Sequence, residues 1–468
     1  MEFGKESWKT FEQGIEKEWL LTNGIGGFAS STIIGANTRR YHGLLFASLK
    51  PPVARHLILS KIDESISINN TAYKLYSYKT PDQIQKGYHH LQRVTVEHIP
   101  AFIYNIGEVF IEKKICMVYG ENTVAVVYRI INGSGAASLR LAPLVNFRDY
   151  HHNSSRDYLQ FNQEENGREV ILKPRSYDLD IKLLCSEGAF TKEENCYFIN
   201  MDYPHERERG LQSVEDHFIP GYFEIDILPG EEKLVTFIAT TEKEIKNTDG
   251  NVIIREEMKR IGEVVDKAGY EDEFARMLVA AADDFIVYRK STGGKTVIAG
   301  YPWFTDWGRD TMISLPGLTL TTRRYQDAKD ILYTFSRYVK DGLVPNVFPD
   351  EGQEPAYNSV DASLWYFEAV GKYIEYTGDH QFVREVLFKV LKEIIQAFVK
   401  GTGFGIRMDE DYLITAGEYG SQLTWMDAKV GDWTVTPRDG KPVEINALWY
   451  NSLRIMGNLC REYGEGDT

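Results

Sequence analysis

Aromatic and charged side chains that suit sugar binding lie together at residues 301–312, YPWFTDWGRDTM. Trp303 and Trp307 supply flat apolar faces, and Arg309 beside Asp310 supplies a cation and a carboxylate. Sugar rings lay their C–H faces on indole, while their hydroxyls bind paired donors and acceptors. The segment therefore indicates a carbohydrate site.

Two further clusters repeat this combination of aromatic and charged side chains. Residues 355–365, PAYNSVDASLW, contain Tyr357 and Asp361. Residues 422–450 contain a larger set: Trp425, Asp427, Asp432, Trp433, Arg438, Asp439 and Glu444. Glycoside cleavage needs one carboxylic acid that protonates the leaving oxygen and a second carboxylate that activates water. The clusters therefore favour a glycosidase.

Asp427 is the strongest candidate for the acid. Trp425 and Met426 beside it would supply the apolar surroundings that keep a carboxylic acid protonated near neutrality. A carboxylate between apolar residues is also costly unless it is paired or functional.

Simpler structural roles compete for the other residues. Asp310 could be a helix N-cap, and Asp361 could be a first-turn carboxylate that favours the helix dipole. Trp425 and Trp433 could be core aromatics, and Arg438 with Asp439 could form a turn ion pair.

The first half of the chain has the pattern of an antiparallel β-sandwich. Short β-branched segments bounded by turn residues predict strands at 123–132, 169–174, 179–185 and 222–229. Turn signals such as those in 132–135 recur at spacings that suit such a sandwich.

The second half has helical periodicity. Apolar residues at three- and four-residue steps predict helices over 271–290, 310–321, 324–341, 359–377, 379–401 and 443–463. Long loops follow alternate helices and hold the unusual residues, while the other connections are short. This alternation predicts an α/α toroid, of which these helices would form about half.

Bulk composition excludes several classes of function. The 468 residues include 53 Lys and Arg against 68 Asp and Glu, a net charge of −15 that disfavours nucleic acid and anionic membranes. The four cysteines form no C-x-x-C pair, which argues against a disulfide framework or a zinc site. The charged N-terminus is no signal peptide, and no window suits a membrane span. We therefore expect a cytoplasmic protein that needs no metal or organic cofactor.

The chain resembles the bacterial and archaeal glycogen debranching enzymes, the amylo-α-1,6-glucosidase family, along essentially its whole length. Four segments carry the resemblance in the same order: 18–45, 301–318, 354–370 and 422–450. The family is similar in architecture to glucoamylases. The resemblance therefore implies a β-super-sandwich over residues 1–250, a linker over 251–270, and an (α/α)6 toroid from 271 to 468.

The resemblance also implies roles for individual residues. Asp427 in TWMDAK matches the family's general acid. Arg309 and Asp310 in WGRD would hold the hydroxyls of a terminal glucose, with Trp307 as a stacking face. The remaining residues expected to line the substrate cleft are Trp303, Tyr357, Asp361, Trp425, Arg438 and Glu444. The implied reaction releases glucose with inversion from α-1,6 branches of glycogen or branched malto-oligosaccharides.

One departure from the family concerns the general base. The family's second carboxylate lies in a later loop of the toroid, whereas this chain ends at Thr468. We therefore expect the base beyond residue 468, and only the first half of the toroid within this chain. A base inside the chain would have to be sought among Glu418, Asp432, Asp439 and Glu444.

The sequence leaves two other functions open. A phosphorylase of similar architecture needs an acid but no base, because phosphate itself attacks. A non-catalytic polyglucan-binding protein would keep the sugar cleft and be indifferent to loss of Asp427.

The N-terminal segments NGIGGF (23–28) and NTRRYHGLL (37–45) have a structural interpretation. Their glycines suit tight turns between strands, and Arg39, Arg40 and His42 would cap a sheet edge. The alternative is that this edge helps to shape the substrate site.

Overall fold

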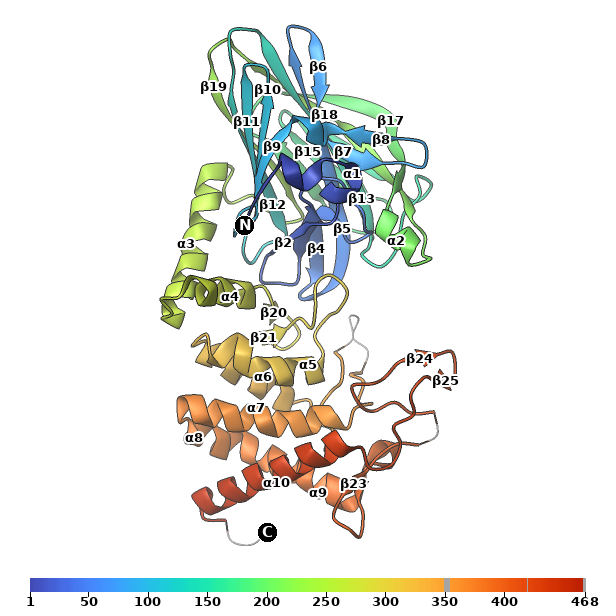
Figure 1. Ribbon diagram of the computed structural model, residues 1–468, viewed down its shortest axis with the longest axis vertical. Coiled ribbons are helices and arrows are strands. Elements are labelled where there is room, and N and C mark those ends of the chain that lie inside the picture. The colour runs from blue at the N-terminus through green and yellow to red at the C-terminus, as the bar shows by residue number, and fades with distance from the viewer. Residues whose placement is uncertain (349–353, 419, 466–468) are drawn as a thin grey trace. The chain divides into compact units, whose positions relative to one another are not determined.

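The computed structural model describes residues 1–348, 354–418 and 420–465, and the chain divides into two units, Met1–Glu263 and Val264–Thr468 (Figure 1). Large antiparallel sheets build the first unit, and helices with short two-stranded hairpins build the second. The predicted change from β-structure to helices along the chain is confirmed.

Two sheets form the first unit. The nine-stranded sheet has the order β1 (Glu2–Gly4), β9 (Leu91–Thr95), β10 (Ala101–Ile106), β11 (Val109–Met117), β12 (Thr123–Ile131), β19 (Glu232–Thr240), β16 (Ile181–Cys185), β15 (Glu169–Pro174) and β14 (Phe161–Asn166). The eight-stranded sheet has the order β17 (Ala189–Asp202), β18 (Val214–Ile227), β13 (Ala137–Asp149), β5 (Val53–Ile68), β4 (Gly43–Lys50), β3 (Phe28–Thr32) and β2 (Glu18–Thr22), with β6 (Thr71–Lys74) beside β5. Smaller elements are the strand pair β7 (Ser77–Lys79) and β8 (Ile84–Lys86), the 3-10 turns η1 (Lys5–Trp8) and η2 (Gly87–His90), and the helices α1 (Phe11–Gly14) and α2 (Pro204–Glu208).

Both faces of β12 are covered by apolar side chains. Val124, Val126 and alternate residues beyond them belong to one large core that also holds buried side chains of β5 in the other sheet. Ala125 points the other way, into a smaller cluster with Ile253 of helix α3 (Gly250–Ala268). The two-residue period of a strand thus places one face in the sandwich core and the other against a helix.

The segment predicted as a linker, 251–270, is helix α3 over most of its length. Its many charged residues lie on the solvent side, whereas apolar residues such as Ile253 and Val265 are buried. The predicted helices began only at residue 271 and did not include this one, although its apolar residues keep a helical spacing. The role of the segment as a linker stays a prediction.

The second unit contains helices joined by loops and hairpins. Its elements are α4 (Glu273–Asp283), β20 (Ile286–Arg289), β21 (Gly294–Val297), α5 (Gly308–Leu315), the π-helix η3 (Pro316–Leu320), α6 (Tyr325–Ser336), α7 (Asp361–Thr377), α8 (His380–Phe382), the π-helix η4 (Val383–Leu387), α9 (Phe388–Lys400), the 3-10 turn η5 (Gly403–Gly405), β22 (Arg407–Met408), β23 (Ile414–Thr415), β24 (Lys429–Val430), β25 (Trp433–Thr434) and α10 (Val443–Tyr463). Within the described residues, no helix has the length and apolar character needed to cross a membrane.

The predicted helices at 359–377 and 443–463 agree closely with α7 and α10. Two other helices were predicted too long, because 286–289 is strand β20 and α6 ends at Ser336. Helix α7 ends at Thr377, and Gly378 caps it with a φ of 65°, a left-handed conformation that favours glycine. Helix α7 packs against α5, α6 and α10 within one apolar core, and the toroid itself stays a prediction.

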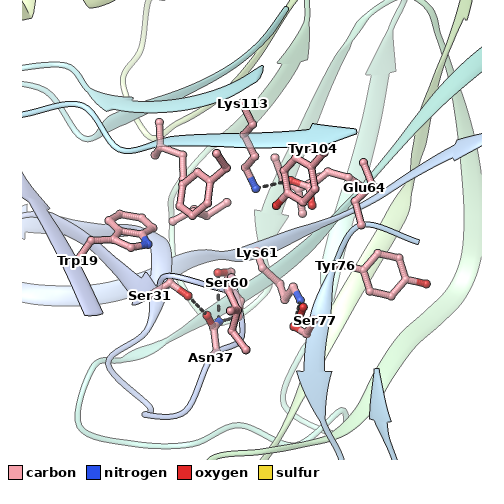
Figure 2. A pocket seen from close by; sticks show the side chains of 17 residues that line it. Trp19, Ser31, Asn37, Ser60, Lys61, Glu64, Tyr76, Ser77, Tyr104 and Lys113 are labelled. Carbon is pink, nitrogen blue, oxygen red and sulfur yellow. Dashed lines mark hydrogen bonds and ion pairs between the residues drawn. The ribbon is translucent and has the colours of Figure 1, made fainter. Parts of the chain in front are cut away.

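A cavity of about 20 Å³ lies inside the sandwich, lined by both polar and apolar side chains (Figure 2). Lys61 donates to the Ser77 carbonyl at 2.7 Å, and Lys113 pairs with Glu64. The volume suits about one water molecule. It is too small for a sugar, so this cavity is excluded as the substrate site.

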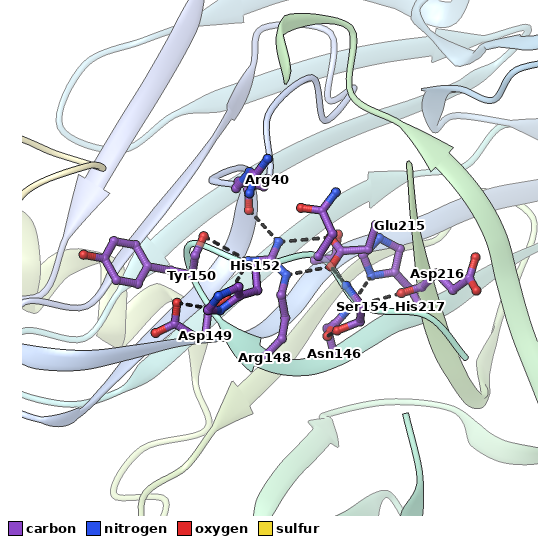
Figure 3. A network of polar contacts seen from close by, with 12 residues as sticks. Arg40, Asn146, Arg148, Asp149, Tyr150, His152, Ser154, Glu215, Asp216 and His217 are labelled. Carbon is purple, nitrogen blue, oxygen red and sulfur yellow. Dashed lines mark hydrogen bonds and ion pairs between the residues drawn. The ribbon is translucent and has the colours of Figure 1, made fainter. Parts of the chain in front are cut away.

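A buried polar network ties β13 to β18 (Figure 3). Arg148 donates from Nε and Nη2 to both carboxylate oxygens of Glu215, at 2.6 and 3.0 Å, and Tyr203 donates to Glu215 at 2.6 Å. His217 accepts at Nδ1 from Asn146 at 3.1 Å, and its Nε2 lies 3.3 Å from the Tyr203 hydroxyl. Because Asn146 is a donor at Nδ1, this geometry suits the neutral imidazole.

Stability of the first unit is expected to fall as the pH drops from about 6.5 to about 4. Burial is the main reason that the pKa of His217 falls from 6.5 to about 4 in the folded chain. In that window the unfolded chain binds the proton and the folded chain does not, so the stabilisation is complete above 6.5 and is lost on acidification. A difference of this size corresponds to roughly 3 kcal/mol.

The measurement is urea unfolding at several pH values, followed by hydrogen exchange of β13 and β18. His217→Gln should reduce the dependence between pH 4 and 6.5, while the part that comes from His42, whose pKa burial also lowers, should remain. Exposed His152 provides the control, since His152→Gln should leave the dependence unchanged. An unaltered slope in His217→Gln would contradict the assignment.

Candidate functional site

The segment with Trp303, Trp307 and Arg309 connects the hairpin β20–β21 to helix α5. Gly308 begins the helix, and its amide donates to the Asn346 carbonyl at 2.8 Å. A Cβ atom at Gly308 would lie 1.9 Å from the Pro345 carbonyl oxygen, so no other residue fits this backbone. The close approach fixes the start of α5, and therefore the place of Arg309, against the segment at 345–347.

Arg309 reaches a carboxylate on another helix. Its Nε donates to Asp361 Oδ2 at 2.7 Å, and the Ser359 hydroxyl donates to Asp361 Oδ1 at 2.6 Å. Asp361 is only 2% exposed, and it begins helix α7. Both oxygens of Asp361 are thus bound, which makes it a support for the guanidinium of Arg309.

Two further carboxylates lie around the same guanidinium. Asp427 Oδ2 is 4.0 Å from Arg309 Nη1, and Asp310 follows Arg309 in the chain. The partly enclosed position of Asp310 is the main cause that raises the pKa of its carboxyl; Arg309 opposes this effect, and the charges of Asp361 and Asp427 add to it. Two acids from distant segments, Asp361 and Asp427, therefore lie near the cation, and Asp310 is its neighbour in the chain.

A second group of side chains lies on the segment from 425 to 444, which also carries Asp427. Arg438 forms an ion pair with Glu444 in the first turn of α10, and its guanidinium lies 5.7 Å from the ring centre of Trp425. Val360 N donates to the Leu423 carbonyl at 2.9 Å, which ties this segment to the start of α7. Arg438 therefore pairs with Glu444, and the alternative of a turn ion pair with Asp439 is not what the structure shows.

The apolar surroundings expected for Asp427 are absent. Its side chain is 51% exposed, and Trp425 is 56% exposed. The expectation was wrong because neighbours along an extended chain point in different directions, and the Trp425 ring lies beside Arg438. Trp433 is likewise 64% exposed, so neither tryptophan is a core residue.

Trp303 and Tyr357 are placed differently. Trp303 is 38% exposed in the loop before α5. Tyr357 donates its hydroxyl to the Tyr338 carbonyl at 2.9 Å and lies under Lys340, with 6.0 Å from the ring centre to Nζ. A role in substrate binding stays a prediction for both residues.

The starts of α5 and α7 exclude one of the two helix-start alternatives and agree with the other. Trp307 holds the N-cap position of α5 and Asp310 lies in the first turn, so Asp310 is not the cap. At α7, Asp361 lies in the first turn, as the helix-dipole alternative predicted, and its carboxylate also binds Arg309. The Ser359 hydroxyl accepts from Ala362 N at 3.2 Å, although Val360 holds the N-cap position.

The N-terminal segment fits its structural interpretation. Residues 23–27 turn between β2 and β3, with φ of 70° at Gly24 and 93° at Gly26. Arg39 pairs with Glu18 at 2.8 Å, Arg40 pairs with Glu206 at 3.3 Å, and His42 accepts from Thr38 N at 3.0 Å. These side chains all serve the sandwich itself.

The Arg309 group combines a fixed cation, two residues after Trp307 in the chain, with an exposed carboxyl, which suits hydroxyl recognition and proton transfer to an oxygen. Of the carboxylates considered as bases, Glu444 is engaged by Arg438, and Asp432 is exposed. In residues 1–348, 354–418 and 420–465 there is no cluster of three or more His, Cys, Asp or Glu that could hold a metal ion.

Sequence reasoning missed three residues that support the site: Arg289, Asp306 and Ser359. The aspartate at 306 lies beside Trp307, yet it was not singled out because it follows no periodic pattern. Asp306 is fully buried and paired with Arg289, 17 residues earlier. The signal that could have found it is a charged residue inside an otherwise aromatic run, since a buried charge needs a partner.

Comparison with known families gives two matches. Residues 17–234 match the family described as Glycogen debranching enzyme N terminal, and residues 280–467 match the family described as Amylo-alpha-1,6-glucosidase. The two matches follow one another along most of the chain.

Individual proteins are more distant. The Glycogen debranching enzyme of Saccharomyces cerevisiae is 29% identical over 223 residues, which cover 35% of this chain and 14% of the yeast protein. Among solved structures, a putative kojibiose phosphorylase from human microbiome has a TM-score of 0.48 at 12% identity, over 86% of this chain and 59% of the other. A bacterial glucoamylase complexed with acarbose has a TM-score of 0.48 at 13% identity, over 96% and 62%. The chain thus spans less than two thirds of each of these proteins.

Proposed function

Because this chain belongs to the glycogen debranching enzyme family, we propose that it takes part in releasing glucose from α-1,6 branches of glycogen or branched malto-oligosaccharides. The observation that carries the proposal is the group around Arg309. Asp361 holds the guanidinium at 2.7 Å, and Asp427 lies 4.0 Å from it. Residues from three distant segments thus meet beside Trp307.

In this proposal, Arg309 and Asp310 bind hydroxyls of the terminal glucose, and Trp307 covers a face of its ring. A guanidinium and a carboxylate match vicinal hydroxyls as donor and acceptor. Asp361 acts indirectly, since both of its oxygens are already engaged.

Asp427 protonates the glycosidic oxygen. Its exposed carboxyl is open to an incoming glucan chain, and binding of substrate would itself remove water from around it. Hydrolysis with inversion also needs a carboxylate that activates water. That role cannot fall to Asp361, whose oxygens are bound to Arg309 and Ser359.

The wall of the proposed site next to the Arg309 group is formed by Trp425, Arg438 and Glu444. The guanidinium of Arg438 lies 5.7 Å from the Trp425 ring centre and pairs with Glu444, which keeps the exposed indole in a defined place. We assign this wall to the glucan chain on the leaving side of the bond.

The proposal is tested by glucose release from a dextrin that carries single α-1,6 glucosyl stubs, with and without inorganic phosphate. If a carboxylate of this chain activates the water, the expected result is glucose released at the same rate in both conditions, and the candidates for that carboxylate are Glu418, Asp432 and Asp439. Linear malto-oligosaccharide serves as the control substrate and should release far less glucose.

Two results would overturn the hydrolase. Release of glucose 1-phosphate only when phosphate is present would make the chain a phosphorylase. Binding of the dextrin without release of either product, by this chain and by one extended past Thr468, would favour a polyglucan-binding role.

A further inference from the structure

A buried ion pair that the proposed reaction does not use lies next to the sugar-binding segment. Arg289, at the end of β20, donates from Nε and Nη2 to the two carboxylate oxygens of Asp306, at 2.6 and 2.5 Å. Thr296 on β21 donates its hydroxyl to Asp306 Oδ2 at 3.0 Å. Arg289 is 4% exposed, and Asp306 and Thr296 are fully buried.

Asp306 is the residue immediately before Trp307, so the ion pair holds the backbone where the proposed site begins. Ala299 N donates to the Thr305 carbonyl at 2.8 Å, which closes the loop that carries Trp303. The Trp307 carbonyl then accepts from Thr311 N at 2.8 Å in the first turn of α5. The pair thus joins the end of this loop to the hairpin β20–β21, which lies beside α5 and α6 (Figure 1).

Arg289 also contacts the segment on the other side of Trp307. Its guanidinium lies 4.8 Å from the ring centre of Phe348. Trp307 itself forms a β-bridge with Val347. Arg289 therefore contacts the residue before Trp307, and also the residue after Val347, which is the bridge partner of Trp307.

We infer that Asp306 and Arg289 are positioning residues for the glucosyl site, acting through the backbone of 306–309 on Trp307 and Arg309; this inference rests on the proposed function. A guanidinium that binds both carboxylate oxygens fixes direction as well as distance, which a lysine ammonium cannot do. Small displacements of binding and catalytic groups cost large factors in binding and rate.

A purely structural role is the alternative, and the chain offers a matched pair to separate the two. Arg324 and Asp283 form another buried ion pair in the same unit, with side chains 10% and 8% exposed. That pair joins α4 to the start of α6, where Arg324 also binds Asp327 at 2.6 Å, and none of these three residues lies within the segment from 303 to 310. Loss of either pair should lower stability, but only loss of the first should disturb the site.

The experiment compares Asp306→Asn with Asp283→Asn in the full chain, with Arg289→Lys as a milder variant that keeps the charge. Binding of the stub-bearing dextrin is measured by calorimetry, and hydrogen exchange is measured for peptides covering 298–309.

We expect Asp306→Asn to weaken binding at least tenfold and to speed exchange in 298–309. Asp283→Asn should bind within threefold of the unchanged chain at a similar loss in melting temperature. Arg289→Lys should lie between them.

The outcomes separate the inference from the function on which it rests. If the unchanged chain binds the dextrin and Asp306→Asn binds equally well, the inference is overturned and the proposed function stands. Equal weakening by Asp306→Asn and Asp283→Asn also overturns it, because the effect would then follow stability alone. If the unchanged chain neither binds nor cleaves the dextrin, the proposed function fails, and the inference fails with it.

Discussion

Replacing Asp427 by asparagine is expected to lower kcat for glucose release by about 10²–10⁴-fold while substrate binding changes little. Asparagine has nearly the same shape but cannot supply the proton. The side chain is half exposed, and Arg309 keeps its partner Asp361, so the fold should be unaffected. The check is steady-state kinetics on the stub-bearing dextrin together with calorimetric binding.

A substrate whose leaving group needs no proton tests the role of Asp427 as an acid most directly. Fluoride departs from α-glucosyl fluoride without protonation, so a variant that lacks only the acid should act on this substrate much better than on the dextrin. Asp411→Asn is the matched control, because Asp411 is also 51% exposed and also faces one cation, Lys441, at 2.8 Å. Equal loss on both substrates would contradict a role as general acid, and full activity of Asp427→Asn would remove it from the site.

Two strands of the β-half could be predicted closely because their signals are local, whereas β18 begins at Val214, eight residues before the predicted start at 222. Strand β15 spans Glu169–Pro174, as the alternation and turn residues predicted, and β12 differs from its prediction by one residue. Each of these strands is bounded by a turn and carries β-branched residues, so no distant contact is needed to recognise it.

The helices of the second half were harder to predict where apolar runs are short. Residues 286–289 continue the apolar pattern of α4, yet they pair with β21 as a strand. A short apolar run does not distinguish a strand from a buried helical turn, and the partner strand lies beyond a turn that the pattern alone does not reveal. The prediction failed there for lack of a non-local contact.

The contacts within the candidate site also could not be predicted, because they join residues far apart in the chain. Residue types identified Arg309, Asp361 and Asp427 separately, but nothing in their spacing says that Asp361, 52 residues away, binds Arg309. The exposure of Asp427 was missed for the same reason, because the path of the segment from 424 to 442 depends on contacts with α7 and α10. Chemistry could be anticipated from composition, whereas the partners required the fold.

Replacing Arg309 by leucine is expected to lower the free energy of unfolding of the helical unit by roughly 3–5 kcal/mol, because Asp361 would remain buried without its cation. Ser359 would still donate one hydrogen bond to Asp361, but a single hydroxyl does not balance a buried charge. Urea unfolding measures the change. Binding of the dextrin should be lost at the same time, since the hydroxyl-binding cation is gone.

A double replacement separates these two effects. Arg309→Leu with Asp361→Leu removes both charges, so at least half of the lost stability should return. Binding should not return, because the cation that contacts the sugar is still missing. Recovery of binding in the double variant would show that Arg309 does not contact the glucose, and a stability loss below about 1 kcal/mol in the single variant would show that Asp361 is satisfied without it.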